Sequence, residues 1–268
     1  MTSNADTFRQ LHLGPAVLLL PNCWDAGSAR LLESLGASAV ATTSAGLAWS
    51  LGYPDGDILP IDKLATAVAA ITRVIGVPLS VDLESGYSQE PAGVGLAVAA
   101  VVAAGAIGIN LEDGADAPEL TAAKIEQARN AAERAGVALF INARTDVYLR
   151  GLVADGDRVA ETLRRARIFR EAGADGFFVP KVVEGAAIRE IAAGAAMPLN
   201  VLAWHGLAPA AELATLGVRR LSSGSGIAQA SWGRARSVAT AFLAEGRSEP
   251  LFENAMIYPE INVLFAAQ

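Results

Sequence analysis

The fold is decided by a stretch that recurs in outline along the chain, Gly105-Ala106-Ile107-Gly108-Ile109-Asn110-Leu111-Glu112-Asp113. Its first glycine tolerates the left-handed conformation in which helices end. A mostly apolar run follows, as in strands that are buried on both faces, and the run ends in carboxylates. The stretch predicts a helix end, a buried parallel strand and a polar loop, in that order.

The same pattern repeats along the whole chain. Gly-Ala or Gly-Val introduces a strand candidate six times, beginning at Gly36, Gly76, Gly105, Gly136, Gly173 and Gly217. The strand candidates number eight: Ala16–Pro21, Ala39–Thr43, Leu79–Leu83, Ile107–Glu112, Ala138–Ala143, Gly176–Val179, Leu199–Ala203 and Arg219–Ser222. Dividing 268 residues by eight leaves about 33 residues per unit, the size of one βα repeat.

These repeats predict a single α/β domain over residues 1–268, a (β/α)8 TIM barrel with a C-terminal helical extension. The barrel spans about residues 12–245, the extension spans residues 246–268, and no Ser/Gly/Pro linker divides the chain. A doubly wound open sheet is the alternative. Its glycine fingerprint is missing after the first strand, where Asn22-Cys23-Trp24-Asp25 stands.

Composition limits the functions that this chain can have. With 21 Lys and Arg against 28 Asp and Glu, the net charge is -7, which argues against nucleic acid as a partner. A hydrophobic content of 52% excludes disorder. One cysteine and two histidines cannot build a disulfide or a zinc site. Without a signal sequence or a long apolar run, we expect a cytoplasmic protein that does not bind membranes and acts on a small molecule.

In a TIM barrel the active site lies at the carboxyl ends of the strands, and here these ends carry carboxylates. Asp82 and Glu84 follow the third strand, Glu112 the fourth, and Arg144 the fifth. Converging carboxylates repel one another unless a cation lies among them, and hard oxygen ligands select Mg²⁺ or Mn²⁺. Asp82 and Glu84 are two residues apart, so on a strand they point to one side. The alternative is that these carboxylates cap a helix or pair with Arg144 as structural ions.

Five motifs together resemble the isocitrate lyase and phosphoenolpyruvate mutase superfamily, in a form similar to the mutases. In order they are Leu20-Pro21-Asn22-Cys23-Trp24-Asp25, Thr43-Ser44-Ala45-Gly46-Leu47 with Leu51-Gly52-Tyr53-Pro54-Asp55-Gly56-Asp57, Val81-Asp82-Leu83-Glu84-Ser85-Gly86-Tyr87, Gly108-Ile109-Asn110-Leu111-Glu112-Asp113 and Ala143-Arg144-Thr145-Asp146. The resemblance runs from Pro21 to about Gly226. It implies a Mg²⁺-dependent barrel that acts on 2-oxo acids and cleaves or forms C–C or P–C bonds.

The resemblance also implies roles for single residues. Asp82 would be the principal metal ligand and contact the substrate, while Glu84 and Glu112 would hold the waters of the metal. A loop would bind the carboxylate and ketone of the substrate through Ser44, Ala45 and Gly46. Asp55 would face the site, Arg144 would anchor the substrate, and the catalytic set would be Asp55, Glu112 and Arg144.

One departure from the family bears on the reaction. Isocitrate and methylisocitrate lyases carry a catalytic loop with Lys, Cys and His after the fourth strand. Here that stretch reads Asp113-Gly114-Ala115-Asp116-Ala117-Pro118-Glu119 and contains none of the three. Cleavage of isocitrate through the usual acid is therefore not expected, and the missing lysine argues against the mutase reaction.

Four further residues are candidates with simpler alternatives. Lys181 ends the sixth strand, where it could form a Schiff base or lie solvated beside Glu184. His205 follows the seventh strand and is either a general acid or base or a local hydrogen-bonding residue. Asn200 could point into the barrel, and Trp24 is expected to wall its mouth.

We therefore expect a Mg²⁺-dependent lyase or decarboxylase of a small 2-oxo (di)carboxylic acid, cleaving C–C rather than P–C bonds through a metal-stabilised enolate. The alternatives are a Schiff-base aldolase that uses Lys181 and a 2-oxo acid binding protein without catalysis. The apolar stretch Leu251–Phe265 has to be buried on this barrel or on a partner. The resemblance implies a homo-oligomer, a tetramer or dimer, in which subunits exchange a C-terminal helix.

Overall fold

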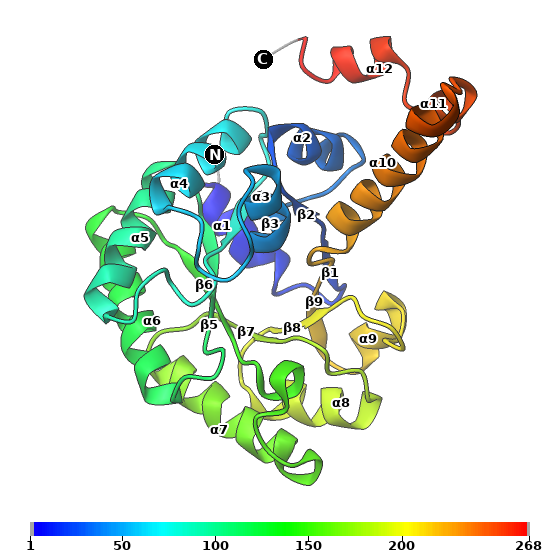
Figure 1. Cartoon of the computed structure of the whole chain (residues 1–268). Helices are drawn as coiled ribbons and strands as arrows, with labels where there is room; N and C mark the ends of the chain where they lie inside the picture. Colours follow the sequence, from blue (N-terminus) through cyan, green and yellow to red (C-terminus); the bar gives the residue numbers. More distant parts are fainter. Residues whose placement is uncertain (1–2, 267–268) are drawn as a thin grey trace.

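The computed structural model describes residues 3–266 and contains a parallel sheet curled into a barrel (Figure 1). Its order is β1-β9-β8-β7-β6-β5-β4-β3-β2, with every pair parallel. The strands are β1 (Leu18–Leu20), β2 (Asn22–Cys23), β3 (Val40–Thr42), β4 (Leu79–Asp82), β5 (Gly108–Glu112), β6 (Phe140–Arg144), β7 (Gly176–Val179), β8 (Leu199–Leu202) and β9 (Val218–Ser222). The predicted (β/α)8 barrel is confirmed.

The first predicted strand, Ala16–Pro21, is in fact two short strands separated by Pro21. Proline has no N–H to donate to a neighbouring strand, so the ladder stops there. β1 pairs with β9, and β2 pairs with β3. The chain therefore changes its pairing partner at Pro21. The two pieces together complete the wall of the barrel.

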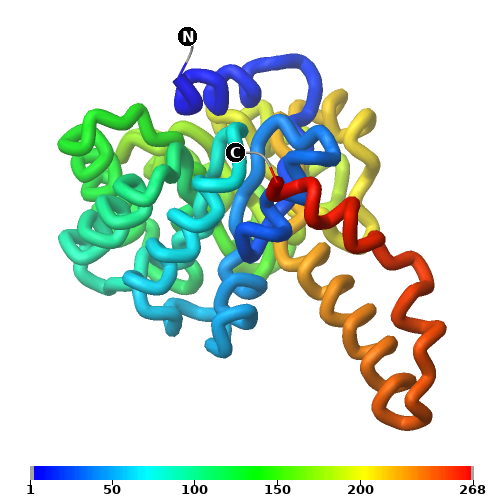
Figure 2. Tube along the Cα trace, turned by 90° about the horizontal axis from the view of Figure 1, so that it is seen from above, coloured from blue at the N-terminus to red at the C-terminus, as the bar shows by residue number. Residues whose placement is uncertain are grey.

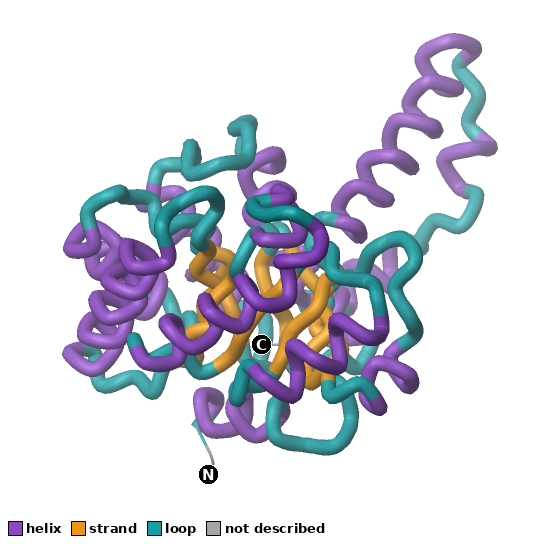
Figure 3. Tube along the Cα trace, turned by 90° about the horizontal axis from the view of Figure 1, so that it is seen from below, coloured by secondary structure: helices purple, strands orange, loops and turns teal. Residues whose placement is uncertain are grey.

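Helices surround the strands (Figure 3). They are α1 (Asn4–Leu11), α2 (Ala26–Ser34), α3 (Ser44–Ser50), α4 (Ile61–Thr72), α5 (Pro91–Ala103), α6 (Pro118–Arg134), a π-helical turn η1 (Val147–Gly151), a 3-10 turn η2 (Asp155–Asp157), α7 (Arg158–Glu171), α8 (Gly185–Gly194), α9 (Ala210–Thr215), α10 (Gly226–Glu245), α11 (Glu249–Phe252) and α12 (Tyr258–Val263). The main core lies between barrel and helices and includes Val81, Val98 and Ile109. No helix within residues 3–266 is both long and apolar enough to cross a membrane.

Five of the six predicted helix-ending glycines have the left-handed backbone, namely Gly36, Gly105, Gly136, Gly173 and Gly217. The expectation is wrong at Gly76, which lies four residues beyond the end of α4 and is absent from the positive-φ set. Its N–H instead donates a hydrogen bond to Glu33 Oε1 at 2.7 Å. That contact joins two neighbouring βα units.

The amino-terminal helix α1 covers the end of the barrel opposite the active-site mouth. Phe8 of α1 is fully buried and packs with Leu18, Leu20 and Phe140. At Gly108 an added Cβ would lie 2.8 Å from the Phe8 ring. The glycine therefore leaves room for an aromatic plug at this end.

The C-terminal segment leaves the barrel. In Figure 2, α10 projects outward in orange, and α11 and α12 run back toward the barrel. Ala228 is the buried residue of α10, which is twenty residues long. Arg30 of α2 donates a hydrogen bond to the Leu264 carbonyl at 2.8 Å, so the returning segment reaches α2. Most of this arm is exposed.

Candidate active site

Asp82 is the last residue of β4, at the mouth of the barrel. Its backbone N–H donates to Thr42 Oγ1 at 2.8 Å, and its Oδ2 accepts from the Ser44 N–H at 3.4 Å. Its Oδ1 is buried without a hydrogen-bond partner. A buried carboxylate oxygen is costly unless something binds it. This atom therefore marks a position where a ligand would be stabilised.

The loop that faces Asp82 begins α3 directly after β3, and Ser44 is its first helical residue. Ala45 and Gly46 are buried. A Cβ at Gly46 would lie 2.8 Å from Thr43 Cγ2 and 3.0 Å from Trp24 Cβ. Packing against Trp24 therefore requires glycine at this position.

Arg144 is held between two carboxylates, Glu112 on the neighbouring strand β5 and Asp146 in the turn after β6. Its Nη1 lies 2.5 Å from Glu112 Oε2, and Glu112 and Arg144 are register partners in β5 and β6. Its Nε and Nη2 donate to the two oxygens of Asp146 at 2.7 and 3.1 Å. The Asp146 side chain is fully buried. The guanidinium is therefore fixed in orientation, which suits the planar recognition of a carboxylate.

Burial and mutual repulsion change the acidity of the carboxyl groups here. Burial raises the pKa of Glu112 to about 8, and the Arg144 guanidinium only partly offsets this effect. Asp55 lies on an exposed loop, and its carboxyl group interacts with the Ser44 side chain. Desolvation and the charge of Asp82 raise the pKa of Asp55. Both groups can hold a proton more readily than ordinary carboxyls.

Glu84 occupies a different environment from the one that strand alternation predicts. β4 ends at Asp82, and Glu84 has φ +51°, so the two-residue period of a strand does not reach it. Its Oε2 accepts hydrogen bonds from the N–H groups of Gly56 and Asp57 at 2.8 and 2.5 Å, and its Oε1 accepts one from the Tyr87 hydroxyl at 2.7 Å. Glu84 therefore holds the loop that carries Asp55, and its role at a metal stays a prediction.

The residues fit a magnesium ion that is bound through few protein ligands. Within residues 3–266 no group of three or more His, Cys, Asp or Glu side chains is arranged so that it could hold a metal ion. Mg²⁺ commonly takes one or two carboxylates and completes its shell with water and substrate oxygens. The unpartnered Oδ1 of Asp82 is such a ligand position.

The barrel interior beneath Asp82 is polar. Arg220 of β9 is almost fully buried and donates to Asn110 Oδ1 at 3.2 Å, while its Nε and Nη1 have no hydrogen-bond partner. Burial lowers the pKa of Arg220 to about 9, and the charge of Asp82 opposes this shift. Asn200 of β8 is buried, with its Oδ1 3.3 Å from the Ser222 hydroxyl. The positive charge of Arg220 inside the barrel stabilises the negative charge of Asp82 at the mouth.

The structure brings together one group of predicted residues and leaves another at the rim. Hydrogen bonds, ion pairs and electrostatic contacts join Ser44, Asp55, Asp82, Glu112 and Arg144. Lys181 and His205 are exposed, in the turns after β7 and β8. Trp24 is half-buried beside Gly46.

Sequence reasoning assigned no role to two residues that organise the site. Asp146 orients Arg144, and Asp57 accepts hydrogen bonds from the Ser85 hydroxyl and the Tyr87 N–H. The available signal for Asp146 was its place two residues after Arg144 at a strand end. Asp57 gave no such signal because its partners are about 30 residues away in the sequence.

Comparison with known proteins assigns the family. The model of the phosphoenolpyruvate phosphomutase family matches residues 8–243. An uncharacterized protein of Mycobacterium tuberculosis strain H37Rv is 37% identical over 223 residues, which are 82% of each chain. A crystal structure from Burkholderia cenocepacia J2315, named provisionally as a lyase/mutase, is 34% identical with a TM-score of 0.89 and covers 98% of this chain and 96% of its own. Phosphonopyruvate hydrolase, solved with oxalate and Mg²⁺, shares the fold at 23% identity with a TM-score of 0.85, covering 98% of this chain and 95% of its own.

The chain belongs to the phosphoenolpyruvate phosphomutase family, within the isocitrate lyase and phosphoenolpyruvate mutase superfamily. The resemblance carried by the five motifs is thereby confirmed. The expectation that the chain is an enzyme is also confirmed, and its relatives include both mutases and lyases.

Proposed function

We propose that this enzyme is a Mg²⁺-dependent lyase or decarboxylase that cleaves a C–C bond of a small 2-oxo (di)carboxylic acid. The observation that carries the proposal is the buried, unpartnered Oδ1 of Asp82 together with the fixed guanidinium of Arg144, with which Asp82 interacts electrostatically. One position suits a cation and the other a carboxylate. A 2-oxo acid that chelates Mg²⁺ and carries a carboxylate satisfies both.

The substrate would be held by groups that are already oriented. Arg144 would bind its carboxylate, in competition with Glu112, and the Ser44 and Gly46 segment would orient the other end through hydroxyl and N–H groups. Asp82 would be the first metal ligand, and Glu112 would hold metal-bound water. Glu84 would hold the loop that carries Asp55 in place. When bound, Mg²⁺ would polarise the 2-oxo group as a Lewis acid.

Cleavage needs a proton at one carbon. In the decarboxylation of a 2-oxo dicarboxylic acid, the bond between the second carboxylate and the carbon next to the carbonyl breaks and CO2 leaves. The electron pair stays on the carbon next to the carbonyl, and that carbon takes up a proton. Burial raises the pKa of Glu112 to about 8, so its carboxyl group can hold this proton near neutral pH, and desolvation also raises the pKa of Asp55. In this proposal Arg144 is the anchor of the substrate and Glu112 is the acid.

The test compares EDTA-treated and Mg²⁺-loaded protein on oxaloacetate and substituted malates. Asp82→Asn should lose Mg²⁺-dependent turnover, while Asp62→Asn, on the exposed surface of α4, should retain it. Equal rates with and without Mg²⁺ would refute the proposal. Tight Mg²⁺-dependent binding of oxalate without any product would instead identify a binding protein, and borohydride trapping of pyruvate on Lys181 would identify the aldolase.

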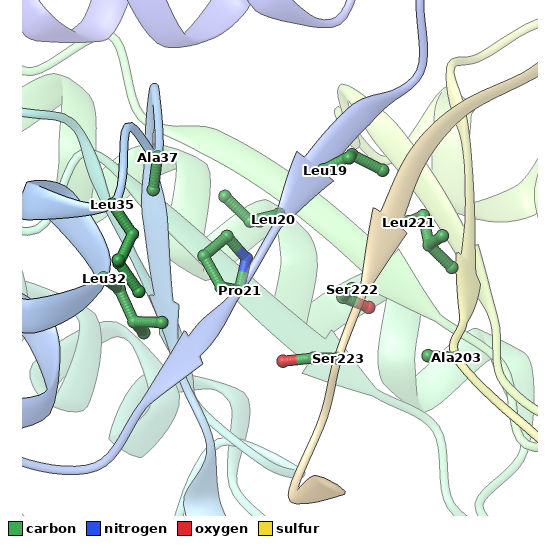
Figure 4. A pocket seen from close by; sticks show the side chains of 10 residues that line it. All are labelled: Leu19, Leu20, Pro21, Leu32, Leu35, Ala37, Ala203, Leu221, Ser222 and Ser223. Atoms are coloured by element: carbon green, nitrogen blue, oxygen red, sulfur yellow. The ribbon is translucent and has the colours of Figure 1, made fainter. Parts of the chain in front are cut away.

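We also propose that the enzyme is a homo-oligomer whose C-terminal arm covers another subunit. Leu19 of β1 is 58% exposed, although strands of a parallel barrel are normally covered by helices on their outer face. Figure 4 shows Leu19 with other apolar side chains around a cavity of about 410 Å³ beside β1 and β9. Since α10 projects away from this face, the matching arm of a second copy is the proposed cover. The apolar side chains of that arm are also exposed, among them Phe252 and Tyr258.

A further inference from the structure

A second cavity lies at the mouth of the barrel, beside the proposed active site. It has a volume of about 370 Å³ and is formed by η1, the start of α7, the turn after β7 and the loop after β8. These elements lie along one side of the barrel in Figure 1. In TIM barrels such loops at the carboxyl ends of the strands bind ligands. Its position alone makes the cavity a candidate site.

The lining of this cavity is strongly basic. Three cations, Arg150, Arg158 and Lys181, face one carboxylate, Glu184, and His205 adds a further hydrogen-bonding group. The chain as a whole has more acidic than basic residues, so this cavity reverses the general balance. Glu184 accepts a hydrogen bond from the Val183 N–H at 3.3 Å. A local excess of positive charge in a concave site favours an anion.

The cations are only partly neutralised by protein carboxylates. Arg158 pairs at 2.6 Å with Asp155, whose side chain is 88% exposed, and such surface pairs are weak. The Arg158 Nε is buried without a hydrogen-bond partner. None of the ion pairs among the residues that the structure describes involves Lys181. Donors therefore remain for a ligand.

Backbone and aromatic contacts hold the lining in place. Lys181 has φ +68°, a left-handed conformation that costs a non-glycine residue energy and recurs at functional sites. The Arg158 guanidinium carbon lies 5.6 Å from the Tyr148 ring, and Tyr148 is buried. The lining is therefore partly preorganised.

A single carboxylate links this cavity to the proposed active site. Asp146 binds Arg144 through both of its oxygens, at 2.7 and 3.1 Å, and its Oδ2 also binds Arg150 at 2.9 Å. The two guanidinium groups are thus neighbours across Asp146. A ligand group in the cavity would lie close to a substrate held by Arg144.

We propose that this cavity binds the oxyanion of a small molecule, a carboxylate or phosphate group, through Arg150, Arg158 and Lys181. The oxyanion is either the far end of an extended substrate or a separate anion bound beside it. The first source rests on the proposed function, because it requires a 2-oxo acid at Arg144. The cavity has room for such a group with a few carbon atoms.

Calorimetry on the full-length protein separates these cases, with inorganic phosphate, oxalate and 2-oxoglutarate as probes in the presence of Mg²⁺. The variants are Lys181→Met and Arg158→Met, and the matched control is Lys63→Met on the exposed surface of α4. Loss of a charge-assisted contact should weaken binding on the order of tenfold or more. Oxalate has no group beyond the two carboxylates that would bind at Mg²⁺ and Arg144, so it should bind all variants equally.

Each outcome decides the proposal. Weaker 2-oxoglutarate binding with unchanged oxalate binding identifies the far end of the substrate. Weaker phosphate binding, with phosphate and oxalate bound together in the wild type, identifies a separate anion. The proposal is overturned if both probes change by less than about twofold in the cavity variants, if Lys63→Met loses as much, or if the wild type binds neither. A wild type that fails to bind oxalate would refute the proposed function, and the phosphate titration would still decide the cavity.

Discussion

Replacing His12 with Asn should make the stability of this protein less sensitive to acid. His12 follows α1 and is 2% exposed, with its ring stacked on Phe140 at 4.2 Å between centroids. Its Nδ1–H donates to the Phe8 carbonyl at 2.8 Å, and its Nε2 is buried without a partner. Burial, aided by the nearby Arg220 and Arg9 charges, lowers the pKa of His12 to about 3, although Asp175 opposes them. The folded protein therefore keeps this imidazole neutral.

The magnitude follows from proton linkage. An unfolded chain binds a proton at His12 below about pH 6.5, whereas the folded protein does so only near about pH 3. The unfolded state binds more protons in this window, so the free energy of unfolding falls as the pH falls. His12 should remove about 2 kcal/mol at about pH 5, and at most about 5 kcal/mol at lower pH, at 1.36 kcal/mol per pH unit.

Urea unfolding of wild type and His12→Asn at about pH 7.5 and pH 5, at one protein concentration, measures the effect. Buried carboxyls act in the opposite direction, because burial raises the pKa of Glu112 and of Asp113. Only the difference between the two proteins therefore isolates His12. The chain has two histidines, so His205→Asn is the matched control and should behave as the wild type. Equal losses of stability in wild type and His12→Asn would refute the reasoning.

Three further predictions concern the site and the assembly. Asp82→Ala should abolish Mg²⁺-dependent oxalate binding in calorimetry. It should not lower the melting temperature, because it removes an unpartnered buried carboxylate oxygen. Unchanged metal affinity would exclude Asp82 as a ligand. Arg144→Lys should weaken 2-oxo acid binding by about 1–3 kcal/mol, since lysine cannot reproduce the planar fork, and affinity within about twofold of wild type would leave Arg144 a structural ion pair. Deleting residues 250–268 should lower the number of chains per particle that light scattering measures. A full-length chain that is already monomeric at micromolar concentration would refute the oligomer.

The barrel could be predicted from the sequence because its signals are local. The predicted strand Gly176–Val179 coincides with β7, and Arg219–Ser222 differs from β9 by one residue. Buried apolar runs and helix-ending glycines each depend on a few neighbouring residues. The helix α1 was not predicted, since its polar sequence contributes one large buried side chain, Phe8, to a distant part of the barrel.

The candidate site was predictable in its charges but not in its pairings. Strand ends revealed Asp82, Glu112 and Arg144 because a barrel brings all strand ends to one mouth. The environment of Glu84 was not predictable, because it depends on where β4 ends and on N–H groups about 28 residues away. Whether a carboxylate faces a ligand or holds a loop is a tertiary property.

The direction of α10 shows a different limit. A repeat of about 33 residues assigns one helix to each strand, yet it does not specify which copy of the chain that helix covers. In a homo-oligomer both copies have the same sequence. The local sequence pattern is therefore the same for a helix that packs on its own subunit and for one that packs on another subunit. Exposure distinguishes them: Leu19 on the barrel wall and Leu243 on α10 are 58% and 82% exposed. Two exposed apolar surfaces on one chain, one a cavity and one a helix, support the proposal that each covers the other across a subunit boundary.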